Sequence, residues 1–204
     1  TSNSPKNNLI RGAAWTVGTR AAVKVLGFVN TVVMARLLMP EDYGLVAMAM
    51  LVVGLIQTML EFGAVTALMR KEHLTQDDID SAWTLKVIQA IGTGCLIAIS
   101  PIIATEFLGE NRISHILPIL AILTTITGFS SLAPVVLSKS FDFTLAFKVD
   151  VCSKLNSVIF TIIGGIWLQD YRALLMGFTA GYLTPLILTY ALHPMRHRLN
   201  TTKI

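Results

Sequence analysis

Several stretches of the sequence are long enough to cross a lipid bilayer and contain no charged side chain. Segments 87–105, 113–137 and 173–192 lack Asp, Glu, Lys and Arg altogether. About 20 consecutive apolar residues form a helix that spans the hydrocarbon core, whereas strands of a membrane barrel are about half as long and alternate in polarity. Charged residues make up 14% of the chain, compared with about a quarter in soluble domains. The sequence therefore predicts an all-α membrane protein.

Polar connections divide the chain into about six expected membrane-spanning helices. These spans, which form one transmembrane lobe over 13–193, are expected at 13–38, 43–69, 82–108, 113–137, 147–168 and 173–192. Residues 1–12 are predicted to be an irregular cytoplasmic lead-in, and residues 194–204 a basic cytoplasmic tail. Pro118 and Pro134 are expected to bend the fourth span, because proline removes a backbone donor.

The distribution of Lys and Arg predicts which connections face the cytoplasm. If the N-terminus is cytoplasmic, the connections on that side carry nine of these residues: Lys6, Arg11, Arg70, Lys71, Lys139, Lys148, Arg196, Arg198 and Lys203. The opposite connections carry three: Arg36, Arg112 and Arg172. Because short loops rich in Lys and Arg stay in the cytoplasm, both ends of this chain are predicted to be cytoplasmic.

Arg20 and Lys24 are the most informative charges, because they fall inside the first predicted span. They share one helical face with Thr16, Gly27 and Thr31, since residues three or four apart line the same side of a helix. At 1.5 Å per residue, Lys24 lies roughly 16 Å from the start of the span, near the middle of the bilayer. A cation at that depth costs from about 2.5 kcal/mol upward, so both side chains are expected to face a cavity and bind substrate.

The other intramembrane charges are expected to complete a positively charged cavity. Lys154, the third predicted substrate-binding cation, follows Asp150 by one helical turn, which is the spacing of an ion pair within a helix. Asp150 and Glu61 are interpreted either as ion-coupling carboxylates or as charge partners of nearby cations. Lys86, near the start of its span, is expected to extend to the lipid headgroups. An excess of cations suits an anionic group such as pyrophosphate, because Arg offers a planar fork and Lys a point charge.

The sequence contains no motif of an enzyme, a cofactor site or a metal site. It has no Gly-rich phosphate loop, and His193 and His197 lie in the basic tail rather than within a span. Cys95 and Cys152 occur in apolar stretches and are expected to be packed thiols. The net charge is +4, but the basic residues are scattered among spans and loops, which argues against a nucleic-acid partner. We therefore expect a protein that is not an enzyme and has no cofactor.

The turn after the first span closely resembles a segment of a known transporter family. Residues 35–49 read Ala-Arg-Leu-Leu-Met-Pro-Glu-Asp-Tyr-Gly-Leu-Val-Ala-Met-Ala. This segment is similar to bacterial polysaccharide flippases of the O-antigen and colanic-acid exporter type, within the multidrug/oligosaccharidyl-lipid/polysaccharide superfamily. The similarity extends to 62–68, 74–78, 171–174 and Pro194, so it covers nearly the whole chain.

This resemblance implies a flippase that moves undecaprenyl-pyrophosphate-linked oligosaccharide across the bacterial inner membrane by alternating access, for surface polysaccharides such as lipopolysaccharide. Flippases of this type have two helical lobes around a central cavity, and six spans correspond to one lobe. The chain is therefore expected to be an N-terminal fragment or a half-size protein. Its expected partners are a second lobe or a homodimer mate, lipid-linked oligosaccharide and membrane lipids.

Two other functions remain open at this point. The first is an ion-coupled exporter of small molecules from the same superfamily, in which Glu61 and Asp150 would be the coupling carboxylates. The second is a membrane scaffold that transports nothing.

Overall fold

The computed structural model describes residues 5–61, 63–71, 74–139 and 143–192, and within these ranges the protein consists of helices without a strand. The helices are α1 (Pro5–Leu37), α2 (Pro40–Met59), α3 (Ala64–Arg70), α4 (Gln76–Ile99), α5 (Pro101–Leu108), α6 (Ile113–Gly128), α7 (Ala133–Lys139), α8 (Thr144–Leu168) and α9 (Arg172–Leu192). In this part of the chain, α1, α2, α4, α8 and α9 are long and apolar enough to cross a membrane, and the bent pair of α6 and α7 makes a possible sixth span. The predicted all-α membrane fold is therefore confirmed.

Two predicted spans are each divided into two helices, which corrects their expected continuity. The span expected at 43–69 is broken after α2, where Gly63 has a φ of 65°, a left-handed conformation that glycine adopts without steric cost. The span expected at 82–108 is broken at Ser100. Pro101 then opens α5, because its missing N–H is not needed in the first turn of a helix.

The fourth predicted span, 113–137, is also broken, although not at its central proline. Pro118 lies within the continuous helix α6. The break falls at residues 129–132, and α6 and α7 are bent by 49° relative to each other. Pro134 lies in the first turn of α7, where a proline is tolerated.

Helices α1 and α4 begin well before the starts that the hydropathy pattern predicts. Helix α1 begins at Pro5, so most of the lead-in expected to be irregular over 1–12 is helical, which fits the preference of proline for the first helical position. Helix α4 begins at Gln76, because Thr75 and Asp78 form a reciprocal capping box in which each side chain accepts a hydrogen bond from the other residue's backbone N–H. The predicted tail at 194–204 lies outside the described residues.

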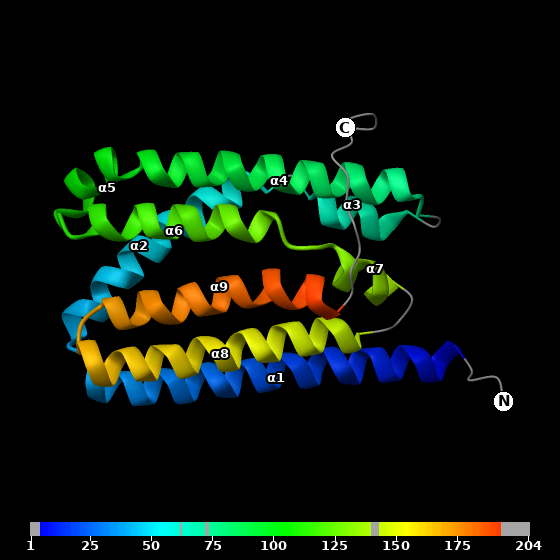
Figure 1. The fold of residues 1–204 in the computed structure, drawn as a ribbon, viewed down its shortest axis with the longest axis horizontal. Helices are drawn as coiled ribbons and strands as arrows, with labels where there is room; N and C mark the ends of the chain where they lie inside the picture. Colours follow the sequence, from blue (N-terminus) through cyan, green and yellow to red (C-terminus); the bar gives the residue numbers. More distant parts are fainter. Residues whose placement is uncertain (1–4, 62, 72–73, 140–142, 193–204) are drawn as a thin grey trace.

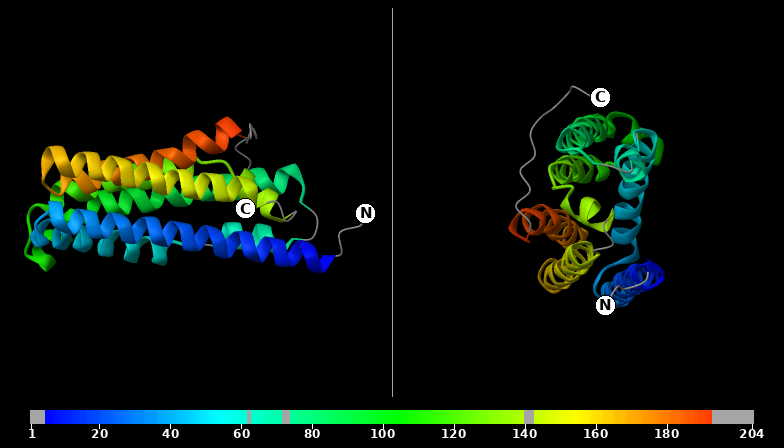
Figure 2. Two further views of the ribbon diagram at one scale, coloured as in Figure 1. Left: turned by 90° about the horizontal axis from the view of Figure 1, so that it is seen from below. Right: turned by 90° about the vertical axis from the view of Figure 1, so that its right-hand side faces the viewer.

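The long helices lie roughly along one axis of the molecule. Helix α4 lies beside α6, α8 lies beside both α1 and α9, and α2 crosses obliquely from the end of α1 toward α4 (Figures 1 and 2). The largest apolar core joins the end of α1 to α2, α4, α6 and α9, and its fully buried side chains include Met34, Leu45, Ile97, Ile116 and Leu117. This core fixes the bundle at the end that carries the α1–α2 turn.

Small residues allow α8 and α9 to approach closely. On α9, a Cβ added at Gly177 would lie 2.9 Å from the backbone oxygen of Ser157 on α8, and one added at Gly181 would lie 3.2 Å from the Cβ of Ser157. On α8, a Cβ added at Gly164 would lie 3.0 Å from the Cα of Ala173. Small residues are typical of helix contacts in membranes, where packing rather than water exclusion drives association. The resulting antiparallel pair forms two walls of the cavity described next.

Candidate functional site: a cationic cavity

A cavity of about 500 Å³ lies between α1, α8 and α9. It is lined by Thr19, Arg20, Val23, Lys24, Asp150, Ser153, Lys154, Ser157, Phe178, Gly181, Tyr182 and Pro185. Four of the five predicted site residues, namely Arg20, Lys24, Asp150 and Lys154, therefore line the same space. This result concerns position alone, and their role in binding stays a prediction.

Helical periodicity explains how each helix supplies its share of the lining. Arg20 and Lys24 are one turn apart on α1, and Asp150 and Lys154 are one turn apart on α8, so each pair projects from one side of its helix. Helix α9 contributes Phe178, Gly181, Tyr182 and Pro185. The sequence analysis missed this third wall because α9 carries no charge along that face. The small residues Gly177 and Gly181, by which α9 packs against α8, are the sequence signal that could have identified it.

Lys154 reaches across to α1 over a glycine. A Cβ added at Gly27 would lie 3.5 Å from Lys154 Cε and 3.6 Å from Lys154 Nζ. The Lys154 side chain is half-buried, whereas Arg20 and Lys24 are exposed within the isolated chain. Because Gly27 has no side chain, the Lys154 ammonium group can lie close to α1 at this position, in the cavity that Arg20 and Lys24 also line.

The cations in this cavity have no ion-pair partner in the described part of the chain. Asp150 and Lys154 have the expected spacing, but no contact within 4.0 Å joins them, so the expected pair is absent. Arg20, Lys24 and Lys154 against Asp150 leave two formal positive charges in excess. Like charges in a low-dielectric environment repel one another, and an anion that enters the cavity relieves this repulsion.

Glu61 does not line the cationic cavity. It lies with Lys86 in a second cavity of about 340 Å³ between α2, α3, α4 and α6. It therefore does not share a cavity with Arg20 or Lys24, and no ion pair joins it to Lys86. The interpretation of Glu61 as a partner of the α1 cations is not supported by this placement.

Lys86 does not extend to the headgroups as expected. Its Nζ donates hydrogen bonds to the backbone oxygen of Ser130 at 2.9 Å and to Ser130 Oγ at 2.7 Å. Ser130 lies in the break between α6 and α7, where backbone carbonyls lack helical partners. Tyr190 on α9 donates to the neighbouring Phe129 oxygen at 2.9 Å. The break is therefore held from two sides. The prediction for Lys86 was wrong because the backbone oxygen and the hydroxyl of Ser130, within this break, lie at hydrogen-bond distance from its ammonium group.

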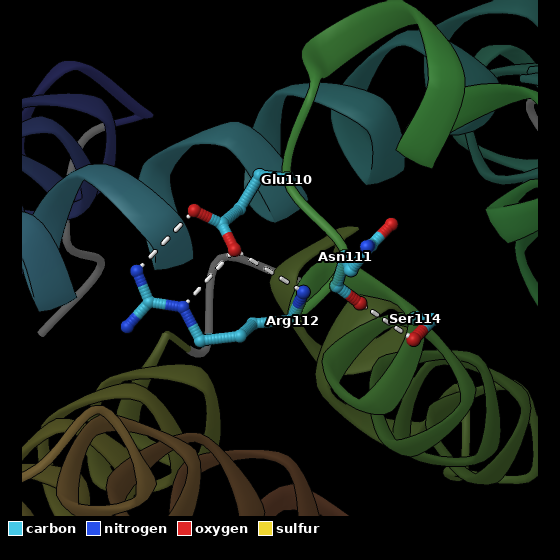
Figure 3. Close-up of polar contacts among 4 residues, drawn as sticks. All are labelled: Glu110, Asn111, Arg112 and Ser114. Carbon is cyan, nitrogen blue, oxygen red and sulfur yellow. Dashed lines mark hydrogen bonds and ion pairs between the residues drawn. The ribbon is translucent and has the colours of Figure 1, made fainter.

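Two ion pairs lie at the opposite end of the bundle. In the turn between α5 and α6, Arg112 Nε donates to Glu110 Oε1 at 3.0 Å and its terminal guanidinium nitrogen donates to Oε2 at 3.2 Å (Figure 3). These hydrogen bonds lower the pKa of Glu110 and raise the pKa of Arg112. Arg172 and Asp170 form a looser pair, with Nε and Oδ2 at 3.7 Å. These two ion pairs contrast with the cations of the cavity, which have no ion-pair partner in the described part of the chain.

The remaining sequence predictions concern cysteine and metal chemistry. Cys95 and Cys152 are free thiols, but both are exposed rather than packed as expected. An apolar sequence does not separate core from lipid-facing surface, because both environments favour apolar residues. No group of three or more His, Cys, Asp or Glu side chains suited to a metal ion occurs among the residues that the structure describes.

Comparison with known proteins places these observations in a family. Residues 33–204 match the family model described as "Polysaccharide biosynthesis protein". The chain is 19% identical over 175 residues to an uncharacterized membrane protein in the cps region of Klebsiella pneumoniae, which covers 86% of the chain. It is 21% identical over 107 residues to the lipopolysaccharide biosynthesis protein WzxC of Escherichia coli K12, and 26% identical over 115 residues to the succinoglycan biosynthesis transport protein ExoT of Rhizobium meliloti.

The chain spans only part of these relatives. The matched segment covers 36% of the Klebsiella protein, 21% of WzxC and 23% of ExoT, whereas the WzxC and ExoT matches cover 52% and 55% of the present chain. No solved structure matches the chain significantly.

Proposed function

Because the chain belongs to the polysaccharide biosynthesis protein family, we propose that it forms one lobe of a transporter for surface polysaccharide precursors. The proposed substrate is an undecaprenyl-pyrophosphate-linked oligosaccharide, which crosses the bacterial inner membrane by alternating access. The names of WzxC and ExoT, which refer to lipopolysaccharide biosynthesis and succinoglycan transport, support this direction. In this proposal the protein moves its substrate without chemical conversion.

The main support for the proposal is the excess of positive charge in the cavity between α1, α8 and α9. A pyrophosphate carries several oxygen acceptors and negative charge, so Arg20 can bind it through two parallel N–H groups while Lys24 and Lys154 add point charges. Ser153 and Ser157 line the same cavity. Their hydroxyl groups can add hydrogen bonds to phosphate oxygens. The lipid tail would remain in the bilayer.

The proposed orientation gives this cavity access from the cytoplasm. If both ends of the chain are cytoplasmic, Asp150 and Lys154 lie in the cytoplasmic half of α8, which begins at Thr144. A precursor made in the cytoplasm would then meet the cations before it meets the paired charges at the opposite end.

A second lobe or a second copy of the chain is the proposed partner that closes the cavity. Helix α1 packs mainly against α8, and its other faces are exposed in the chain, with Val17 at 66% and Phe28 at 70% exposure. Apolar side chains on such a helix can contact either lipid or another helical lobe.

The ion-coupled exporter is the weaker candidate. Asp150 lines the cationic cavity, and Glu61 shares its cavity with the ammonium group of Lys86. A nearby fixed cation opposes the binding of a metal cation by simple repulsion. The remaining alternative, a membrane scaffold that transports nothing, predicts that removing any of these charges leaves export unchanged.

Export of surface polysaccharide by cells is the direct test. The variant Arg20→Ala with Lys24→Ala removes two charged donors, each worth about 1.5–3 kcal/mol in a desolvated site, so export should fall by at least about tenfold. The matched control, Arg70→Ala with Lys148→Ala, removes one Arg and one Lys from exposed positions outside the cavity. Normal export by the cavity variant, at the same protein abundance as wild type, would refute the proposal.

A further inference from the structure

The second cavity, between α2, α3, α4 and α6, offers a chemistry different from that of the cationic cavity. Its polar lining includes Gln57, Glu61, Thr66, Lys86, Gln89 and Thr93. It therefore combines one carboxylate, one ammonium group, two carboxamides and hydroxyl groups. The cavity adjoins the connection between α2 and α3, which contributes Glu61 and Gly63 to its lining.

Several of these polar groups are available for a ligand. The side chains of Gln57, Glu61 and Gln89 have no hydrogen bond or ion pair to other side chains or to the backbone within the described ranges. Lys86 is held in place by its two bonds to Ser130, which leave one N–H of the ammonium group unused. The protein therefore fixes the position of the Lys86 ammonium group, while the carboxylate and the two carboxamides can bind a ligand.

The combination of charges excludes two simple classes of ligand. A metal cation would meet the ammonium group of Lys86, and Glu61 is the one carboxylate among the lining residues. A second phosphate would meet the carboxylate of Glu61. A neutral molecule with many hydroxyl groups fits best, because each hydroxyl both donates and accepts and can satisfy carboxylate, carboxamide and ammonium groups together.

We propose that this cavity binds a neutral sugar residue. Glu61 would accept hydrogen bonds from two neighbouring hydroxyls of the sugar, while the carboxamides of Gln57 and Gln89 both donate and accept. The free N–H of Lys86 donates to a further hydroxyl or to the ring oxygen. Selectivity follows from the same groups, because the carboxylate of Glu61 repels an acidic sugar that enters the cavity.

The position of the cavity connects this inference to transport. The cationic cavity is lined by residues 150–157, in the first half of α8, and the second cavity by residues 124–128, at the end of α6. The start of α8 and the end of α6 both point toward α7 (Figure 1). The assignment of this sugar to the transported glycan rests on the proposed function, in which the cationic cavity binds the pyrophosphate. Binding of a sugar by the second cavity can be tested separately.

The test measures binding of methyl α-D-glucopyranoside and methyl α-D-galactopyranoside to the purified full chain in lipid nanodiscs by saturation-transfer NMR. We expect a signal with the wild type for at least one of these glycosides. Glu61→Gln and Gln89→Leu should each weaken it by about tenfold, because each removes a hydrogen bond to the sugar. Glu106→Gln is the matched control, because Glu106 is an exposed carboxylate of α5 outside the cavity.

A parallel titration with inorganic pyrophosphate separates this inference from the proposed function. Arg20→Ala with Lys24→Ala should abolish binding of pyrophosphate and leave glycoside binding unchanged. Binding of pyrophosphate without binding of either glycoside would overturn the sugar site and leave the proposed function standing. Equal glycoside signals from the wild type and from both the Glu61 and the Gln89 variants would also overturn it. Loss in the Gln89 variant with no loss in the Glu61 variant would overturn the role given to the carboxylate.

Discussion

Gly177 tests whether close approach of α8 and α9 holds the cationic cavity together. A methyl group added there would overlap Thr161 Oγ1 and would lie 2.9 Å from both Thr161 Cβ and the backbone oxygen of Ser157. A side-chain oxygen can rotate away, but a backbone oxygen moves only with its helix. Gly177→Ala should therefore push α9 away from α8 and loosen the wall formed by Ser157 and Gly181.

The size of the effect follows from two opposing contributions. Overpacking of a tight contact costs about 1–3 kcal/mol, whereas replacing glycine by alanine within a helix favours folding by up to about 1 kcal/mol. We expect a net loss of about 1–2 kcal/mol for Gly177→Ala. Gly181→Ala should lose less, because its nearest neighbours are the Cβ and Oγ of Ser157 at 3.2 and 3.3 Å.

Gly92 supplies the matched control. It lies within α4, and a Cβ added there would meet nothing within 4 Å. Gly92→Ala should therefore be neutral or should stabilise the protein by about 0.5–1 kcal/mol through reduced backbone freedom in the unfolded chain. The measurement is thermal unfolding of the purified variants in the same detergent. If Gly177→Ala unfolds at a temperature as high as that of Gly92→Ala, close helix packing does not limit the spacing of α8 and α9.

Three further outcomes test local features. Lys86→Met should cost about 1.5–3 kcal/mol, because it removes a charged donor from Ser130, and hydrogen exchange should increase at residues after the α6–α7 break. Asp78→Ala should lower the free energy of unfolding by more than about 1 kcal/mol, measured by thermal unfolding, because it removes both the capping box and the ion pair of Asp78 with Lys71 Nζ at 2.8 Å. Arg112→Ala should raise the pKa of Glu110, followed by carboxyl NMR. Because this pKa is lowered in the folded protein, the contribution of the pair to stability is present at neutral pH and is lost as acidification protonates the carboxyl.

The helical faces of the cationic cavity follow from local periodicity. Arg20 and Lys24, like Asp150 and Lys154, are four residues apart, and a helix places such pairs on one side whatever it packs against. The cost of a cation in hydrocarbon made these faces candidates for a cavity. Local periodicity did not predict that the charged face of α1 and the charged face of α8 line the same cavity, because this depends on which side of α8 packs against α1. The close approach of Lys154 to Gly27 depends on the same packing of α8 against α1.

Glu61 and Lys86 show where charge counting alone fails. The sequence analysis treated both as parts of one pool of intramembrane charges, in which any carboxylate could neutralise any cation. The fold separates them from Arg20 and assigns Lys86 to the carbonyl and hydroxyl of Ser130. Ser130 lies 44 residues away in the sequence, at a break that no hydropathy pattern marks.

The sequence by itself determined the helical membrane character of the protein, the approximate number of its spans and the faces on which its charges lie. These properties depend on apolar length and on the helical repeat, which are local. Tertiary structure alone decided which charged faces share a cavity, and that Cys95 and Cys152 are exposed. The physical reason is that lipid and protein core favour the same apolar side chains, so only the packing of one helix on another distinguishes the inside of the bundle from its surface.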